Sequence, residues 1–285
     1  MTGKPWRAGL VALVLTMSLT AGAAQGQGNS SSRILGGSVD RRTDNSWVTA
    51  VLFRNSHKPG DRFSRQFCTG SLVDARWVLT AAHCITTDSG GRESPGTLEV
   101  LVGQKDLNAN PATGPGEVIN VAQVVRFPGY NFRTLRGDAA LLRLATPSAH
   151  LPVAIARNQP RKGTRSYIAG WGDTRPYDSS GNAFPRALHS AYIPTIGDRQ
   201  CSQSPVHAGS YDARTMFCAG KPRARPDTCQ GDSGGPIAIR KGGVQPWRLI
   251  GVTSYGFCGR KPPWLAVYTR ITASPIEPWI NRILP

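Results

Sequence analysis

The 285-residue sequence is poor in acidic residues: it has 17 of them against 34 basic ones, and its formal net charge is +17. The basic residues are scattered along the chain rather than clustered. Proteins that bind nucleic acid specifically concentrate their cations on one face or one helix, so this distribution argues against such a partner. We interpret the charge as a well-solvated surface that can adhere weakly to anionic material.

The sequence also lacks an apolar run long enough to cross a membrane. Its longest apolar stretch extends from Ala8 to about Ala21, roughly 14 residues where a spanning helix needs about 20. Lys4 and Arg7 precede this stretch, and small residues follow it up to Ala24. This order is typical of a secretory signal peptide, which we place at residues 1–24, with a signal anchor as the alternative. The mature chain is then expected to be secreted, into the periplasm or the extracellular medium.

Patterns typical of metal sites are absent as well. The six cysteines form no Cys-x-x-Cys pair and no Cys/His cluster at ligand spacing, so neither a metal nor another cofactor is expected. An even number of cysteines in an exported chain predicts disulfides formed in an oxidising compartment. Spacing alone leaves the pairing of these cysteines open.

Residues 25–33 are mostly Gly, Ser, Asn and Gln without apolar periodicity, and they end at Arg33 before the apolar pair Ile34 and Leu35. Such a segment is typical of a short propeptide. Two further segments, 86–97 and 108–117, are rich in Gly and Pro, and we predict that they are surface insertions of unassigned function.

Short β-rich segments separated by Gly, Pro, Asn and Asp make up most of the remaining chain, which indicates a barrel or a sandwich. One group comprises 47–53, 70–73, 77–80, 98–102, 118–125 and 139–144, and the other comprises 166–171, 188–193, 216–219, 236–240, 249–254 and 266–270. A stretch with Pro and Arg, 146–163, separates the two groups. Apolar residues at three- and four-residue steps predict a helix over 275–284.

The strongest chemical signal is the segment from Asp227 to Pro236, which reads Asp-Thr-Cys-Gln-Gly-Asp-Ser-Gly-Gly-Pro. It places Ser233 between glycines that leave the neighbouring backbone amides open. Upstream, Thr-Ala-Ala-His-Cys supplies a base, His83, and Gly-Asp-Ala-Ala-Leu-Leu supplies an acid, Asp138. A serine hydroxyl is a weak nucleophile at neutral pH, and it needs such a base for acyl transfer.

These three motifs, in the order His, Asp, Ser, resemble those of the chymotrypsin/trypsin family of serine endopeptidases, in its trypsin-like branch. The resemblance extends from Arg33 to the C-terminus. It implies an all-β fold of two tandem antiparallel six-stranded β-barrels with a C-terminal helix. The protease domain would then occupy 34–285, with one barrel at about 34–150 and the second at about 151–270.

By this resemblance, His83, Asp138 and Ser233 form the catalytic triad. The backbone amides of Gly231 and Ser233 form the oxyanion hole, which stabilises the negative charge that develops on the substrate carbonyl. The implied disulfides are Cys68 with Cys84, Cys201 with Cys218, and Cys229 with Cys258.

The resemblance also implies activation by cleavage after Arg33. The freed ammonium group of Ile34 would insert beside the carboxylate of Asp232 and order the oxyanion loop. Because Asp232 has no evident catalytic task of its own, a buried ion pair accounts for it well.

The specificity pocket is expected to have the Asp227 carboxylate at its base, where it would bind an Arg or Lys side chain of the substrate. The residues expected to line it are Thr228, Gln230, Ser254, Tyr255, Gly256 and Ala266. The sequence departs here from the trypsin pattern, with Tyr255 in place of Trp and Ala266 in place of Gly. Only Phe257 separates Gly256 from Cys258, one residue fewer than usual. We expect the Ala266 methyl to narrow the pocket.

The calcium loop of trypsin has no convincing counterpart, because Gln104 stands where a carboxylate ligand is expected. The sequence therefore predicts a monomeric, secreted serine endopeptidase that cuts proteins or peptides after Arg or Lys, with protein inhibitors as further partners. One alternative is a catalytically silent cationic binding protein on the same fold. The other is an enzyme that prefers apolar side chains because Ala266 shields Asp227.

Overall fold

The computed structural model describes residue 34 and residues 36–175, 183–204, 210–223, 226–256, 258 and 264–285. The chain divides into two units, Met1–Ser30 and Ser31–Pro285, and the second contains all the described residues. The predicted signal peptide, the predicted propeptide with Arg33, and Phe257 of the pocket rim lie outside the described residues. None of the described helices has both the length and the apolar character that crossing a bilayer requires.

Strands make up most of the regular structure. The strands are β1 Ser38–Val39, β2 Val48–Phe53, β3 Gln66–Asp74, β4 Trp77–Thr80, β5 Leu98–Val102, β6 Glu117–Arg126, β7 Ala140–Leu144, β8 Ala154–Ile155, β9 Arg165–Gly170, β10 His189–Ile196, β11 Met216–Lys221, β12 Pro236–Arg240, β13 Trp247–Gly256 and β14 Trp264–Arg270. The helices are α1 Arg62–Arg65, α2 Asp198–Ser202 and α3 Ile276–Ile283, with 3-10 turns η1 His83–Ile85 and η2 Pro95–Thr97.

The first barrel closes from antiparallel strands in the order β2-β3-β4-β7-β6-β5. Strand β6 follows the two-residue period of a sheet with one buried face: Ile119 and Val121 are buried, and the residues between and beside them are exposed. Strand β5 is buried along its whole length. The last residue of β4, Thr80, pairs with the first residue of β7, Ala140. The segment that follows β4 and the segment that precedes β7 therefore lie side by side at one end of the barrel.

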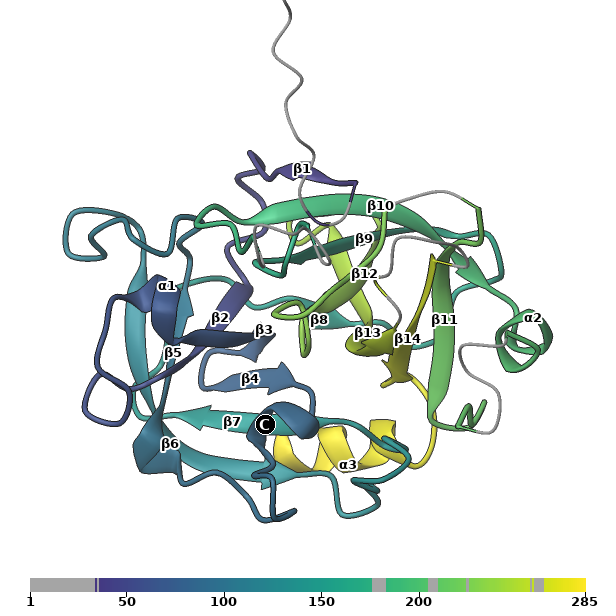
Figure 1. Ribbon diagram of the computed structural model, residues 1–285, viewed down its shortest axis with the longest axis horizontal. Coiled ribbons are helices and arrows are strands. Elements are labelled where there is room, and N and C mark those ends of the chain that lie inside the picture. The colour runs from purple at the N-terminus through teal and green to yellow at the C-terminus, as the bar shows by residue number, and fades with distance from the viewer. Residues whose placement is uncertain are drawn as a thin grey trace, which may run out of the picture. The chain divides into compact units, whose positions relative to one another are not determined.

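The second barrel runs through β9, β10, β11, β14, β13 and β12, and β12 pairs with β9 to close it. The two-residue strands β1 and β8 attach to β10 and β13. Two closed six-stranded antiparallel barrels with a C-terminal helix were expected from the sequence, and the structure confirms this architecture. Figure 1 shows the strands of both barrels within Ser31–Pro285, with α3 near β7.

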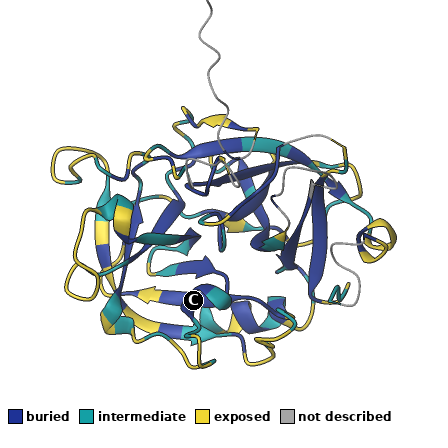
Figure 2. Cartoon of the chain, in the orientation of Figure 1, coloured by how far each residue is buried: buried dark blue, intermediate teal, exposed yellow. Residues whose placement is uncertain are grey.

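Large aromatic side chains fill the interior. Trp47, Trp247 and Tyr167 are fully buried, and the Tyr167 ring centroid lies 4.7 Å from that of Trp247. Helix α3 buries the apolar face that its sequence predicts, and Trp279 contacts Phe127 edge-on at 5.4 Å between ring centroids. In Figure 2, buried residues run along the strands and exposed residues are concentrated in the loops and turns.

The segment 86–97 departs from a plain surface insertion. Thr86 and Arg92 form an isolated antiparallel bridge, and Pro95–Thr97 form the turn η2. The Arg126 guanidinium donates hydrogen bonds to the Thr86 hydroxyl and to the carbonyls of Gly90 and Gly91. These contacts hold the segment in a defined hairpin. The short helices α1 and α2 were not predicted, because four or five residues carry too little periodicity to read.

Candidate active site

His83 and Asp138 come from the adjoining ends of β4 and β7. The fully buried Ala81 and Ala82 lead from β4 into η1, where His83 is the first residue. Asp138 follows Gly137, whose φ of 67° is a conformation that favours glycine. A Cβ at Gly137 would lie 2.7 Å from Cδ1 of Phe127, so no larger residue fits here. Packing therefore fixes the backbone that leads into His83 and the backbone that leads into Asp138.

The Asp138 carboxylate holds His83 at two points. The His83 backbone amide donates to Oδ1 at 2.8 Å, and the ring nitrogen Nδ1 lies 2.7 Å from Oδ2. The Ser254 hydroxyl donates to Oδ2 at 2.5 Å, and the Thr269 hydroxyl donates to the Asp138 carbonyl at 2.7 Å. Strands β13 and β14 of the second barrel thus fix an acid that belongs to the first.

The charge of Asp138 changes the acid-base behaviour of the imidazole. Burial of the ring favours its neutral form and lowers the pKa, but the Asp138 charge and its hydrogen bond outweigh burial and raise the pKa of His83 above its ordinary value of 6.5. The Asp138 side chain is completely buried, whereas that of His83 is 26% exposed. One edge of an imidazole whose pKa is raised is therefore accessible.

The Ser233 loop lies between β11 and β12, and hydrogen bonds to both barrels hold it. The Thr69 amide of β3 donates to the Ser233 carbonyl at 2.8 Å, and the Gly234 amide donates to the Thr253 carbonyl of β13 at 2.8 Å. Gly234 has a φ of 78°, and a Cβ there would collide with the Thr80 hydroxyl and the Thr69 carbonyl. Glycine is required at this position because the two barrels meet there.

The backbone amides of Gly231 and Ser233 have no hydrogen-bond acceptor among the residues described. Gly231 has a φ of 92°. Its carbonyl accepts hydrogen bonds from the Thr69 hydroxyl at 2.9 Å and from the side-chain amide of Gln66 at 3.1 Å. Two unsatisfied N–H groups beside a hydroxyl can bind a developing oxyanion.

Asp232 points away from this surface into the protein. Its carboxylate accepts hydrogen bonds from the Gly172 amide at 2.8 Å and the Cys229 amide at 3.0 Å. Burial raises the pKa of Asp232 to about 7, and Asp173 adds to the increase, although the two amides lower it. Within the described part of the chain, no cationic group pairs with this carboxylate.

A cavity of about 310 Å³ lies on one side of Ser233. We refer to it as the first cavity. It is lined by His83, Leu135, Thr228, Cys229, Gln230, Ser233, Thr253, Ser254, Tyr255, Gly256 and Cys258. Five of the predicted pocket residues thus border the same space as His83 and Ser233. Within the described chain no hydrogen bond joins His83 to the Ser233 hydroxyl, and such bonds commonly tighten only when substrate binds.

Two predicted pocket residues do not line the first cavity. Asp227 and Ala266 are both completely buried, and the Thr228 amide donates to Asp227 Oδ1 at 2.8 Å. Ala266 pairs with Gly256 across β13 and β14, and a Cβ at Gly256 would lie 3.2 Å from the Ala266 Cβ. The Ala266 methyl therefore packs beside Gly256, on the same face of the sheet, and is not among the residues that line the first cavity.

A second cavity of about 580 Å³ lies on the other side of Ser233. It is lined by Phe53, Phe67, Cys68, His83, Cys84, Thr86, Thr87, Asp88, Glu93, Gln230, Gly231 and Ser233. Sequence reasoning missed half of these residues, namely Phe53, Phe67, Thr86, Thr87, Asp88 and Glu93, and it also missed Leu135 of the first cavity. The sequence offered one signal for this cavity, the position of Asp88 and Glu93 in a segment just after His83. It did not show on which side of Ser233 these two carboxylates lie.

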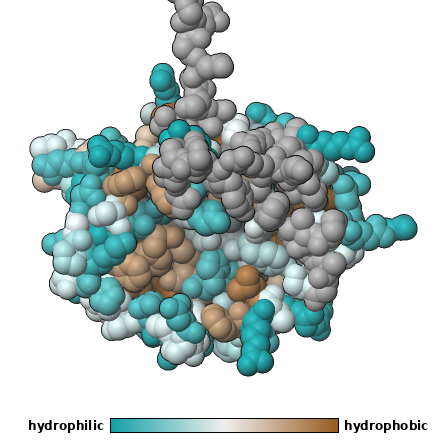
Figure 3. All heavy atoms as spheres, in the orientation of Figure 1, coloured by the Kyte–Doolittle hydropathy of each residue, from teal (hydrophilic) through white to brown (hydrophobic). Residues whose placement is uncertain are grey.

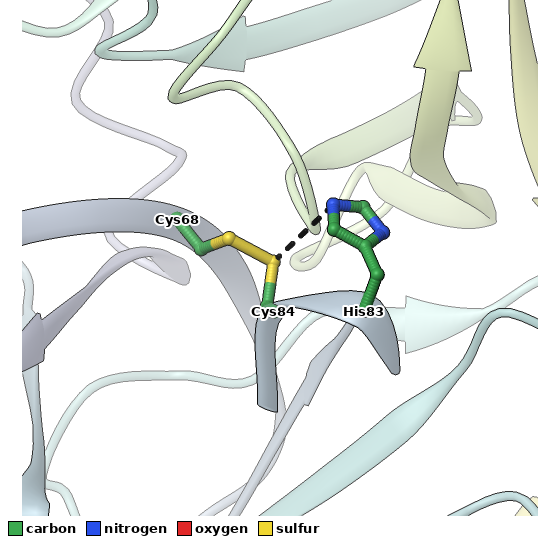
Figure 4. Close-up of side chains that lie close together, drawn as sticks. All are labelled: Cys68, His83 and Cys84. Atoms are coloured by element: carbon green, nitrogen blue, oxygen red, sulfur yellow. Dashed lines mark hydrogen bonds between the residues drawn. A yellow bond between two sulfur atoms is a disulfide. The ribbon is translucent and has the colours of Figure 1, made fainter. Parts of the chain in front are cut away.

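Three disulfides, Cys68–Cys84, Cys201–Cys218 and Cys229–Cys258, join all six cysteines. Cys68–Cys84 ties η1 to β3, so it restrains His83 directly. Figure 4 shows the imidazole beside this disulfide, with Nε2 at 3.9 Å from Cys84 Sγ. Ligand atoms of Cys68, His83 and Cys84 lie within 4.8 Å of one another. Because the two sulfurs are bonded to each other, they offer no thiolate to a metal ion.

Comparisons with known proteins agree with this geometry. A family model described as Trypsin matches residues 34–280. The chain is 35% identical over 258 residues to a curated protein named "Transmembrane protease serine 9" from Rattus norvegicus. The match covers 88% of this chain and 22% of that protein, so the chain spans about a fifth of the length of the curated relative it matches.

Proposed function

The chain belongs to the chymotrypsin/trypsin family of serine endopeptidases, and from this premise we propose that it hydrolyses peptide bonds after Arg or Lys through an acyl-enzyme on Ser233. The observation that carries the proposal is the first cavity, where His83, held twice by a buried Asp138, borders the same space as Ser233. The free amides of Gly231 and Ser233 lie beside the nucleophile.

In the proposed reaction the Ser233 Oγ attacks the substrate carbonyl carbon while His83 Nε2 takes the hydroxyl proton. The oxyanion accepts hydrogen bonds from the amides of Gly231 and Ser233. The carbon–nitrogen bond then breaks, and the imidazolium gives its proton to the leaving amine. Water attacks the acyl-enzyme by the same route and regenerates Ser233. Asp138 holds the imidazole tautomer and stabilises the imidazolium in both halves.

The preference for Arg or Lys is assigned to Asp227. A buried carboxylate at the end of an otherwise uncharged cavity attracts a substrate cation more strongly than an exposed one, because water screens it less. The Thr228 amide donates a hydrogen bond to one carboxylate oxygen of Asp227 and thereby fixes the orientation of this carboxylate.

Activation is assigned to cleavage after Arg33. Asp232 lies against Gly170, the last residue of β9, and Ile34 packs with Ile168 of the same strand. Residues 168 and 170 share one face of β9 and are roughly 7 Å apart along the strand. A freed Ile34 ammonium would thus start close to a buried carboxylate that lacks a cation. We further propose that the enzyme is secreted and monomeric.

The first experiment is hydrolysis of matched Arg, Lys, Phe and Leu peptides by the form that begins at Ile34, with N-terminal sequencing to verify the start. Fast cleavage after Arg or Lys that an organophosphate abolishes is expected. No cleavage and no covalent labelling of Ser233 by the correctly processed, folded protein would instead favour a catalytically silent cationic binding protein.

One observation favours a second candidate specificity. Asp227 has no exposed surface, and the buried Ala266 methyl packs beside Gly256, which lines the first cavity. An enzyme whose first cavity ends before the carboxylate would select an apolar side chain. In the same experiment, this enzyme would cut the Phe and Leu peptides faster than the Arg and Lys peptides.

A further inference from the structure

The second cavity lies where the leaving half of a substrate must pass. His83, Gln230 and Ser233 line both cavities, so the nucleophile stands between them. An extended peptide whose acyl half fills the first cavity can leave the nucleophile only on the side of Gly231 and the Cys68–Cys84 disulfide. The residues of this wall are therefore the ones that the first residues after the scissile bond would contact.

Two carboxylates line this second cavity, although acids are half as frequent as bases in the chain. In the described chain, neither Asp88 nor Glu93 forms an ion pair or a side-chain hydrogen bond. Other acids do pair: Asp40 with Arg42 and Lys105, and Glu99 with Arg65. Among the residues that the structure describes, the negative charge of Asp88 and Glu93 beside Ser233 therefore has no ion-pair partner.

The carboxylates are carried by a segment with fixed geometry. The Glu93 amide donates to the Ile85 carbonyl at 3.0 Å, and the Thr87 amide donates to the Gly91 carbonyl at 3.1 Å. The Arg126 guanidinium holds the Gly90 and Gly91 carbonyls from the side of β6. A ligand that pairs with Asp88 and Glu93 therefore need not order the loop first.

An aromatic wall adjoins the carboxylates. The Phe53 and Phe67 rings are stacked with centroids 4.2 Å apart, and both line the cavity. In Figure 3, apolar residues are exposed on this face over β2 and β3. Arg and Lys place an apolar stem along such a surface while the charged head reaches an acid, and guanidinium also stacks on aromatic rings. An aspartate or glutamate side chain would be repelled.

We propose that the second cavity binds a cationic side chain, Arg or Lys, in one of the first two residues after the scissile bond, so that paired basic sequences are the preferred substrates. The proposal rests on the proposed function, since it takes the first cavity as the acyl side. Asp88 and Glu93 act as specificity determinants that touch the leaving half of the substrate, and Phe53 and Phe67 support its stem.

The test uses the form that begins at Ile34 and internally quenched peptides with one acyl half, ending in Arg. The leaving half carries Arg, Ala or Glu at its first position in one series and at its second position in another. In at least one series, kcat/KM for Arg should exceed that for Ala by on the order of 5- to 10-fold, as for two partly exposed ion pairs. The preference should weaken as salt is raised.

Two variants locate the effect. The double variant Asp88→Asn with Glu93→Gln should bring the Arg-to-Ala ratio close to one, mainly through a fall in kcat/KM for the Arg peptide. A control with the same charge change, Asp106→Asn with Glu277→Gln, alters carboxylates that do not line the cavity, and it should retain the ratio. Equal rates for Arg and Ala in both series, or a ratio that survives the double variant, would overturn the proposal. Loss of hydrolysis of every peptide would instead overturn the proposed function.

Discussion

The two cavities that meet at Ser233 differ in where their charge lies. On the side that we assign to the acyl half, the carboxylate of Asp227 is completely buried next to Thr228 of the lining, and no acidic residue among those described lines the cavity itself. On the leaving side, Asp88 is exposed and Glu93 is half-buried, and both line the cavity directly. A buried charge discriminates strongly because little water screens it, whereas exposed charges add a smaller preference that salt weakens. The comparison predicts a selective acyl side and a permissive leaving side.

Ser233→Ala tests the proposed nucleophile, which lines both cavities. Without the hydroxyl no acyl-enzyme forms, and turnover should fall on the order of 10⁶-fold for every substrate. Thermal unfolding should change little, because the described contacts of Ser233 run through its backbone carbonyl. The measurement is kcat on the best Arg peptide together with the melting temperature. Residual turnover near that of the parent enzyme would remove Ser233 from its role.

Asp138→Asn tests the base. The change should lower turnover on the order of 10⁴-fold, since the imidazole loses the carboxylate that holds its tautomer. In the parent, activity should fall as pH drops through a pKa of His83 that lies above 6.5, because a protonated imidazole cannot accept a proton. Removing the Asp138 charge takes away the cause of that increase, so the acid limb of kcat/KM should move to lower pH. An unmoved acid limb would assign it to another group.

Asp227→Ser should change the selectivity of the first cavity and leave the selectivity of the second cavity unchanged. The ratio of kcat/KM for Arg over Phe at the acyl position should fall on the order of 10²- to 10³-fold, which is the usual consequence of removing one partner from a buried charge pair. The ratio for Arg over Ala on the leaving side should stay as it was. A simultaneous loss of both ratios would mean that the two cavities do not act separately.

Ala266→Gly should increase the selectivity of the first cavity for basic side chains. The Ala266 methyl packs beside Gly256, and we expect its removal to lengthen the first cavity toward Asp227. Cleavage after Arg and Lys should rise about 3- to 10-fold, and cleavage after Phe should not, because one methylene in a pocket changes discrimination by this order. A variant that gains on Phe instead would support the apolar specificity.

Asp232→Asn should have the smallest effect, on the stability of the uncleaved chain. The pKa of Asp232 is raised to about 7 from an ordinary value of 3.8, so the unfolded state binds fewer protons than the folded state between these values. Stability should therefore decrease as pH rises through this window, and Asn should remove that contribution. Urea unfolding at several pH values measures the slope. An identical slope in the variant would contradict the raised pKa.

Short β-rich segments separated by Gly, Pro and Asn indicated a barrel or a sandwich, and the family resemblance implied the two six-stranded barrels that the structure has. The twelve barrel strands fall within a few residues of their predicted bounds, and the helix near Trp279 follows from its apolar spacing. His83, Asp138 and Ser233 stood in motifs whose chemistry is legible. The fold brings His83 and Ser233 to one cavity and buries Asp138 against the imidazole of His83.

The remaining features depend on three-dimensional packing that linear spacing does not encode. Whether Ala266 lines the first cavity, or packs beside Gly256 without lining it, depends on the register of β13 against β14. The loop that carries Asp88 looked like a tolerated insertion, and only its hairpin and the Arg126 contacts direct it toward Ser233. Leu135 could not be found because nothing in its sequence neighbourhood marks a cavity wall.

The contact of Gly234 with Thr80 and Thr69 has a consequence for timing. The base and the acid belong to the barrel that emerges first from the ribosome, whereas the nucleophile belongs to the barrel that emerges second. A nascent or half-folded chain therefore carries no complete set of reacting groups. In the proposed mechanism, hydrolysis requires that the second barrel dock and seat this glycine against the first, so a half-folded chain is inert toward its neighbours even if it has been cleaved after Arg33.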